Sequence, residues 1–177
     1  MNNSPQEYLA FANKLADAAG ITSMEYFRTS LSIDSKSDES PVTIADQNTE
    51  LKIRSMIEKE YPDHGILGEE FDSVNPDAEF IWVIDPIDGT RSYIAGHKDF
   101  GNLISLTQNK KPIIGIINCP AHDERWVGVR NQNSTVNQKI VKTSNVTEIE
   151  DAYIFTSGLY FDEPQLRNAV DKIKNKV

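Results

Sequence analysis

Acidic side chains follow two short apolar runs of the sequence, at positions where strands would end. Residues 80–84 are apolar and lead into Asp85, and Asp88 follows three positions later. Residues 66–67 lead, through one glycine, into Glu69 and Glu70. Two like charges about 4 Å apart repel by about 4 kcal/mol at an effective dielectric constant of about 20. If these carboxylates meet, a proton or a cation must therefore neutralise them.

The donor atoms of these two acidic segments are oxygens, because neither segment holds a histidine or a cysteine. Oxygen ligands favour hard cations such as Mg²⁺, Mn²⁺ or Ca²⁺. The residues that follow Asp88, Gly89 and Thr90, can open a helix whose free N–H groups would bind a phosphate. Carboxylate-held Mg²⁺ beside an anion site is typical of metal-assisted phosphoryl chemistry.

Three other interpretations of these acids are open. Asp85-Pro86 and Asp88-Gly89 are also common turn sequences. Phosphatases of the haloacid dehalogenase type use an aspartate nucleophile, and Asp88-Gly89-Thr90 resembles part of their signature. Their two aspartates lie two positions apart, whereas these lie three apart, so that interpretation fits poorly. A calcium-binding structural module would use the same oxygen donors.

Two helices are predicted in the first third of the chain. Ser4 and Glu7 form a capping box, and the apolar stripe that follows them continues to about residue 27. Thr43 and Asp46 form a second capping box, ahead of a helix that ends near residue 60. These helices would position whatever lies at the ends of the later strands.

Short apolar runs of strand length come next. They lie at residues 66–67, 80–84, 103–107, 113–117, 126–129 and 153–155, and a final helix is predicted at 163–176. Residues 109–112 join two of these runs as an antiparallel hairpin. Pro86 cannot donate to a sheet ladder, so we expect the strand that begins at residue 80 to end before it. Helices followed by a run of strands predict an α+β or mixed α/β arrangement.

The composition excludes several classes of protein. The chain has 177 residues, a net charge of −9 and a single cysteine, Cys119. The length fits one domain, and the acidity argues against nucleic acid as a partner. No apolar run approaches the roughly 20 residues of a membrane span. No signal-peptide pattern is visible and no disulfide can form within the chain, so we expect a cytoplasmic protein that does not bind membranes.

Three motifs together resemble the inositol monophosphatase-like family. Residues 82–90, WVIDPIDGT, resemble its signature, and Gly68-Glu69-Glu70 matches its upstream acidic element. Residues 36–46, KSDESPVTIAD, resemble its Lys-x-Asp…Pro-Val-Thr-x-Ala-Asp segment. The motifs occur in the family's order and spacing, and the resemblance covers essentially the whole chain.

The resemblance implies a fold and an activity. The fold would be the layered α-β-α-β-α sandwich of the sugar phosphatases and inositol monophosphatases. The activity would be Mg²⁺-dependent hydrolysis of a small phosphorylated metabolite. Residues 88–104 and 112–128 resemble the branch that hydrolyses histidinol phosphate, in histidine biosynthesis, more than the inositol branch. Inositol 1-phosphate, or a related sugar or nucleotide phosphate, is the alternative substrate.

The resemblance also implies roles for individual residues. The groups that would hold Mg²⁺ are Glu69, Asp85, the backbone carbonyl of Ile87, and Asp88. Thr90 would help orient the attacking water, with Glu69 or Asp46 as its catalytic partner. The reaction would be a direct in-line attack by metal-activated water, without a phospho-enzyme.

Two further sets of residues are implied at the edge of this site. Asp88 and the backbone N–H groups of Gly89 and Thr90 would bind the phosphate of the substrate. Lys36 and Asp38 would lie on a loop that closes over a further metal ion.

One family motif is missing from the sequence. Members carry a Trp-Asp dipeptide near the C-terminus, whose aspartate binds the second metal, whereas Trp82 and Trp126 are each followed by valine. We therefore expect residues 1–145 to form the N-terminal metal-binding half and residues 146–177 to begin a C-terminal half that is incomplete. The chain is then a fragment of a longer product or a short protein, and an inactive metal- or phosphate-binding fragment is an alternative function. A homodimer that covers the open face is left open.

Overall fold

Two long helices begin at the capping boxes that the sequence predicts. The computed structural model describes residues 4–30, 33–35, 41–153 and 164–174 of the chain. In it α1 spans Pro5–Tyr26 and α2 spans Ile44–Glu60. The Ser4 hydroxyl accepts the N–H of Glu7, and the Glu7 carboxylate accepts the N–H of Ser4. The second box, made by the residue before α2 and its third helical residue, is also present, so both predictions are confirmed.

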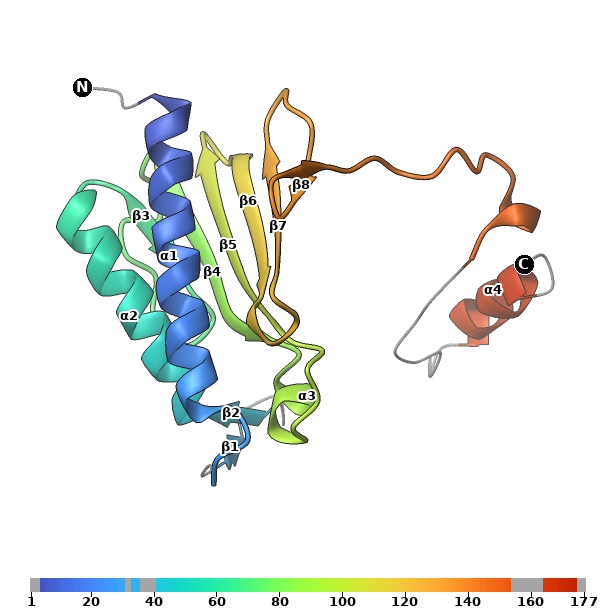
Figure 1. The fold of residues 1–177 in the computed structure, drawn as a ribbon, viewed down its shortest axis with the longest axis horizontal. Helices are drawn as coiled ribbons and strands as arrows, with labels where there is room; N and C mark the ends of the chain where they lie inside the picture. Colours follow the sequence, from blue (N-terminus) through green and yellow to red (C-terminus); the bar gives the residue numbers. More distant parts are fainter. Residues whose placement is uncertain (1–3, 31–32, 36–40, 154–163, 175–177) are drawn as a thin grey trace. The chain divides into compact units, whose positions relative to one another are not determined.

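A seven-stranded mixed sheet runs beside these helices (Figure 1). Its order is β3-β4-β5-β6-β7-β8-β9, with β3 and β4 parallel and every other neighbouring pair antiparallel. The strands are β3 (Gly65–Leu67), β4 (Phe80–Asp88), β5 (Gly101–Gln108), β6 (Lys111–Cys119), β7 (Glu124–Val129), β8 (Thr135–Val136) and β9 (Lys139–Ile140). A separate antiparallel pair, β1 (Ile33–Ser35) and β2 (Pro41–Thr43), precedes α2. This helix-and-sheet architecture confirms the predicted fold class.

The chain divides into two compact units, Met1–Val141 and Lys142–Val177. The first unit also contains the short helix α3 (Thr90–Ile94) and a 3-10 turn at Pro120–His122. The second contains a 3-10 turn at Ile149–Asp151 and α4 (Pro164–Lys174), which lies where the sequence predicts the final helix. The strand predicted at 153–155 falls largely outside the described residues. No helix in the described part of the chain is both long and apolar enough to cross a membrane.

One face of the sheet is buried under α1 and α2 (Figure 1). The side chains that fill this interface include Phe11, Leu15, Ile53, Ile57, Trp82, Ile84, Ile104, Leu106, Ile114 and Ile116. Full burial of one such side chain stabilises the fold by about 1.5–3 kcal/mol. Because side chains alternate along a strand, Ile117 and Trp126 point to the opposite face, where they are 49% and 40% exposed.

The sequence prediction that Pro86 ends its strand is wrong. The strand β4 continues to Asp88, and its pairing with β5 shifts register between Asp85 and Asp88. A bulge of this kind leaves residues out of the regular ladder, which is where a proline is tolerated inside a strand. Pro112, inside β6, likewise sits next to a register shift.

Two hairpins of the sheet use tight turns. Asn109 and Lys110 connect β5 to β6 with positive φ angles of 49° and 63°. Asn137 and Gln138 connect β8 to β9 in the same way, at 45° and 68°. Positive φ at both central residues is the geometry that matches the right-handed twist of two paired strands. The first hairpin is as the sequence predicts, and the β8–β9 hairpin has no counterpart in the sequence analysis.

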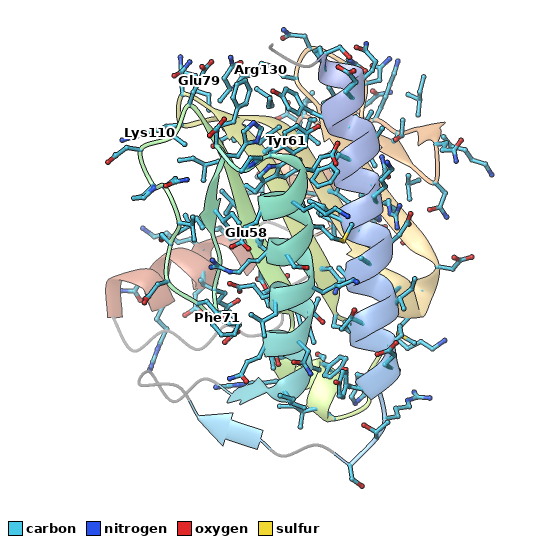
Figure 2. The ribbon with its side chains drawn as sticks, turned by 90° about the vertical axis from the view of Figure 1, so that its left-hand side faces the viewer. Glu58, Tyr61, Phe71, Glu79, Lys110 and Arg130 are labelled. Atoms are coloured by element: carbon cyan, nitrogen blue, oxygen red, sulfur yellow. The ribbon has the colours of Figure 1, made fainter. Side chains whose placement is uncertain are left out.

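His64 lies in a group of aromatic rings where α2 ends. Tyr61, at the end of α2 in Figure 2, stacks on His64 with ring centroids 4.6 Å apart. Phe80 also stacks on the imidazole, with ring centroids 5.1 Å apart. The indole N–H of Trp82 donates to His64 Nδ1 at 3.1 Å, and because an indole only donates, this nitrogen must be unprotonated. Burial lowers the pKa of His64, partly opposed by the negative charges of nearby carboxylates.

We predict that His64 makes the fold sensitive to acid. Its native pKa lies below the unfolded value of about 6.5, so the unfolded chain binds the proton more readily. The stability that neutral His64 contributes is complete above pH 6.5 and is lost as the pH falls through the lowered native pKa. The linkage limit is about 1.4 kcal/mol per pH unit, and partial exposure keeps the effect smaller. Urea unfolding at pH 7.5 and 5.5 should show a smaller loss for His64→Gln than for the parent.

The exposed His97 supplies the matched control for this measurement. A His97→Gln variant should follow the parent at both pH values. Parallel losses in the parent and in His64→Gln would contradict the role given to His64.

Candidate functional site

The strand β4 delivers its acidic residues through a turn whose middle is buried. We call residues 85–90 the acidic turn. Ile87 is 1% exposed and packs with Ala45, Tyr93 and Phe100 in a second, smaller apolar cluster. Its carbonyl accepts the hydroxyl of Thr90 at 3.0 Å. The turn is thus anchored by a side chain that points inward, while Asp88 on its outer side is exposed.

Gly89 makes the reversal from β4 into α3 possible. It caps α3 with φ 85° and ψ 36°, in the left-handed region that favours glycine. A Cβ at this position would lie 2.8 Å from the carbonyl oxygen of Asp99. Any other residue would therefore be both strained and crowded, and the direction of Thr90 depends on this glycine.

Asp85 lies among like charges and is partly buried. Burial, the charge of Glu69 and a hydrogen bond with that residue, and then the charges of Asp88 and Asp46, raise the pKa of Asp85 to about 7. Its Oδ1 atom is buried without a hydrogen-bond partner among the described residues. The structure therefore brings Asp85 together with Glu69, Asp88 and Asp46, and it leaves one buried oxygen of Asp85 without a hydrogen-bond partner.

These residues suit a hard cation by their chemistry. A buried carboxylate oxygen without a partner, close to further carboxylates, is stabilised when a cation approaches it. As the side chains stand, no three His, Cys, Asp or Glu side chains in the described ranges are arranged to hold a metal ion. Which of Glu69, Asp85, Ile87 and Asp88 would bind it stays a prediction.

Asp46 is buried in a structural role at the start of α2. It is 2% exposed, and its Oδ2 atom accepts the backbone N–H of Thr43 at 2.8 Å and the Thr43 hydroxyl at 2.6 Å. Its negative charge still reaches Asp85. The capping box that the sequence predicts thus places one more carboxylate beside the acidic turn, and the catalytic part given to Asp46 stays a prediction.

Glu50 positions the second acidic segment, although it lies outside the motifs that the sequence predicts for the site. This fully buried carboxylate accepts the backbone N–H groups of Glu69 at 3.0 Å and Glu70 at 2.8 Å. Its other oxygen pairs with Arg54 at 2.7 Å. A Cβ on Gly68 would collide with the Glu50 carboxylate, so the glycine before the acidic pair lets this contact form.

Arg54 completes the support of this segment. It donates to the carbonyl of Phe71 at 2.9 Å and lies over the ring of that residue, which is found alongside α2 in Figure 2. The available sequence signal was the spacing of Glu50 and Arg54, four residues apart on a stripe that also carries Ile53 and Ile57. Charged residues on an apolar stripe indicate a buried pair rather than a solvated face.

The remaining predicted residues divide into two groups. Gly89 and Thr90 lie in the acidic turn, directly after Asp88, and their contacts with a substrate stay predictions. Lys36 and Asp38 lie outside the described residues.

Comparison with known proteins identifies relatives along almost the whole chain. Residues 4–177 match the model of the inositol monophosphatase family. A bifunctional phosphatase, IMPL2, from Arabidopsis thaliana is 37% identical over 186 residues, which cover 99% of this chain and 54% of the relative. A histidinol-phosphatase from Chlorobaculum parvum is 38% identical over 168 residues, which cover 94% of this chain and 65% of the relative. The chain therefore spans about half to two thirds of the length of these relatives.

The fold is also similar to that of a solved inositol monophosphatase. A solved structure of an inositol monophosphatase from Zymomonas mobilis superposes with a TM-score of 0.84 at 39% sequence identity. The match covers 99% of this chain and 68% of that protein.

We predict that truncating Glu50 destabilises the fold strongly. Glu50→Ala leaves Arg54 buried without its partner, which typically costs about 3–5 kcal/mol. The backbone N–H groups of Glu69 and Glu70 lose their acceptor as well. Urea unfolding measures this loss, and Glu58→Ala, at an exposed position of the same helix (Figure 2), is the matched control. A change within about 0.5 kcal/mol of that control would contradict the role of Glu50.

Proposed function

This chain belongs to the inositol monophosphatase family, and from that premise we propose that it acts as a Mg²⁺-dependent phosphomonoester hydrolase. The observation that carries the proposal is Asp85, a partly buried carboxylate with a raised pKa and an unpartnered oxygen among further acids. Crowded carboxylates of this kind are stabilised by a bound cation, and their oxygens are the ligands that Mg²⁺ prefers. The acids of the turn would therefore form the metal site of a phosphatase.

The proposed roles follow from the position of each group. Glu69, Asp85, the carbonyl of Ile87 and Asp88 would hold the metal. Bound Mg²⁺ would supply an activated water and would offset the charge of the leaving oxygen. The Thr90 hydroxyl donates its hydrogen to Ile87, so its lone pairs are directed to accept a hydrogen from the attacking water. Glu69, exposed at the edge of the site, would accept the proton that this water loses.

The proposed substrate is a small phosphorylated metabolite, and histidinol phosphate comes first. The histidinol-phosphatase relative and the branch resemblance in residues 88–104 and 112–128 support this choice. Inositol 1-phosphate is the second candidate, because the structural relative from Zymomonas mobilis is an inositol monophosphatase. Histidine biosynthesis, a cytoplasmic location and a homodimer belong to the same proposal. An inactive, metal- or phosphate-binding fragment is the competing function.

We predict that Mg²⁺ stabilises the protein through Asp85. Mg²⁺ at ten times its dissociation constant adds about 1.4 kcal/mol of stability, or roughly 3–6 °C in Tm for a chain of this size. Asp85→Asn should abolish most of this shift. In metal-free buffer at pH 8, above the raised pKa of about 7, the parent carboxylate is ionised at a cost, so Asp85→Asn should be more stable than the parent.

Thermal unfolding with and without Mg²⁺ measures both effects. Asp77→Asn, at an exposed position outside the site, should retain the full Mg²⁺ shift. An equal shift in the parent and in Asp85→Asn would exclude Asp85 as a ligand.

We predict that Asp88 is required for turnover. The 177-residue chain should release phosphate from histidinol phosphate in excess Mg²⁺ faster than from inositol 1-phosphate. Asp88→Asn should lower this rate by at least about 100-fold, more than the loss expected for a residue that only supports a metal ligand. Phosphate release is the measurement, with Asp77→Asn again as the control. Release from neither substrate by a chain that binds Mg²⁺ would favour the inactive fragment, and an Asp88→Asn variant as active as the parent would remove the assigned site.

A further inference from the structure

Asn102 of β5 lies opposite the bulge that shapes the acidic turn. Asp85 pairs with Leu103 and Asp88 pairs with Gly101, so two residues of β4 face the single residue Asn102. A bulge bends its strand and takes residues out of the regular ladder of hydrogen bonds. Whatever holds the bulge at this position therefore decides where the carboxylates of Asp85 and Asp88 point.

The side chain of Asn102 bonds directly to the bulge. Its Nδ2 atom donates to the carbonyl of Pro86 at 2.7 Å and to the hydroxyl of Ser23 at 3.3 Å. Asn102 is fully buried and Pro86 is buried as well, so water does not compete for this contact. A buried polar side chain that bonds the backbone of another strand specifies the geometry of that strand more than it adds stability.

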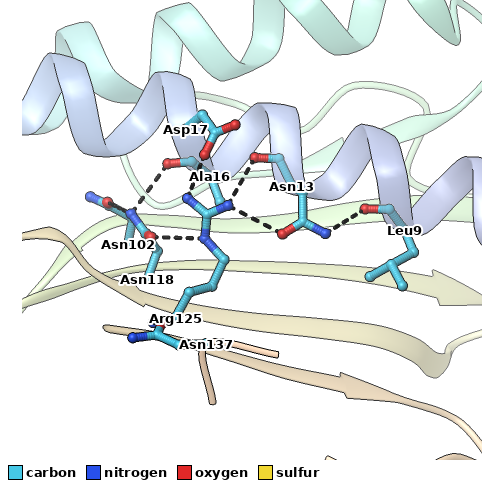
Figure 3. Close-up of polar contacts among 8 residues, drawn as sticks. All are labelled: Leu9, Asn13, Ala16, Asp17, Asn102, Asn118, Arg125 and Asn137. Carbon is cyan, nitrogen blue, oxygen red and sulfur yellow. Dashed lines mark hydrogen bonds and ion pairs between the residues drawn. The ribbon is translucent and has the colours of Figure 1, made fainter. Parts of the chain in front are cut away.

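A chain of donors fixes which way the amide of Asn102 faces (Figure 3). Arg125 only donates, and its Nε bonds the Oδ1 of Asn118 at 3.0 Å. The Nδ2 of Asn118 must then face inward, where it donates to the Oδ1 of Asn102 at 2.9 Å. The Nδ2 of Asn102 is consequently left for the Pro86 carbonyl, which only accepts. Both ends of the chain demand the same orientation of both amides.

The helix α1 anchors this chain at its outer end. Arg125 pairs with Asp17 at 2.7 Å and bonds the side-chain oxygen of Asn13 at 3.2 Å, as Figure 3 shows. Asn118 also donates to the carbonyl of Ala16 at 3.2 Å. Gly20 makes room for it, since a Cβ there would lie 2.9 Å from Asn118 Nδ2. A glycine inside a helix costs about 0.5–1 kcal/mol relative to alanine, so its presence here has a packing reason.

We propose that Asn102 is a positioning residue that holds the backbone of the acidic turn, which carries the proposed Mg²⁺ ligands, through the Pro86 carbonyl, with Asn118 and Arg125 fixing the orientation of its amide. The proposal deepens the proposed function and rests on it, because positioning matters to metal affinity only if the turn binds Mg²⁺. The residues that position the turn then lie on β5, β6 and β7. In the order of the sheet, these strands are on the other side of β4 from β3, which leads to Glu69.

The test compares Mg²⁺ binding by calorimetry in matched variants, at a temperature where each is folded. Asn102→Leu keeps a side chain of similar size and removes the donor to Pro86. Support of metal ligands by neighbouring groups is typically worth 10–100-fold in affinity, so its dissociation constant for Mg²⁺ should rise by about that factor. Thr107→Val is the control, because Thr107 also lies on β5 and also donates to a carbonyl of β4, that of Ile81, at the other end of the strand. Its affinity should stay within about twofold of the parent.

A second variant tests the same chain from the helix. Gly20→Ala should displace Asn118 and weaken Mg²⁺ binding, although an alanine normally favours a helix. This variant decides the question if Asn102→Leu does not fold. Unchanged Mg²⁺ affinity in a folded Asn102→Leu, or in Gly20→Ala where it replaces that variant, would overturn the proposal.

Amide hydrogen exchange separates a failure of this inference from a failure of the proposed function. Asn102→Leu, but not Thr107→Val, should speed exchange at residues 87–90 by about tenfold or more. If the parent binds no Mg²⁺, the proposed function fails, and faster exchange confined to these residues still supports positioning by Asn102. Unchanged exchange there overturns the positioning role whatever the parent binds.

Discussion

Repulsion among carboxylates at the end of β4 is the constraint on which the rest of the site depends. Asp85 is partly buried beside Glu69, Asp88 and Asp46, and its raised pKa expresses first the cost of burying its charge and then the repulsion of these neighbours. Left alone, the acids would separate, because an exposed carboxylate is better solvated than a crowded one. The surrounding structure must therefore hold each acidic segment by its backbone, which carries no net charge.

Two separate devices do this. The buried carboxylate of Glu50 accepts hydrogen bonds from the backbone N–H groups of Glu69 and Glu70, and its charge is neutralised by the ion pair with Arg54. In the acidic turn, the side-chain amide of Asn102 donates a hydrogen bond to the carbonyl of Pro86 within the bulge. Each device bonds main-chain atoms, so the acidic side chains remain available to a cation.

The helix α1 links the two ends of the acidic turn. The carbonyl of Ser23 accepts the hydroxyl of Tyr93, which belongs to α3 just after the turn, at 2.6 Å. The hydroxyl of the same serine accepts from Asn102, which holds the turn from the strand side. Residues at both ends of the turn thus bond the same serine of a helix whose apolar face is packed on the sheet. Packed interiors transmit displacements rather than absorb them, so the position of α1 matters to the site.

The local elements could be predicted because their causes are local. The capping boxes at Ser4 and Thr43 follow from residues three apart, and the acidic motif at residues 82–90 is contiguous. The strand end at Pro86 was mispredicted because a proline inside a strand is tolerated only at a bulge, and a bulge needs knowledge of the partner strand.

Residue types and their spacing are enough to establish which acids are present, where the helices begin and which family the motifs resemble. The tertiary structure alone decided that Glu50 would hold residues 69–70 and that Asn102 would meet Pro86. These contacts join residues that lie 16 to 20 positions apart in the sequence, and the contact between Arg125 and Asn13 joins residues 112 positions apart. A sequence can indicate that a polar side chain is buried, but it does not show which backbone group that side chain will bond, because the partner is chosen only when the strands pair and the helices pack.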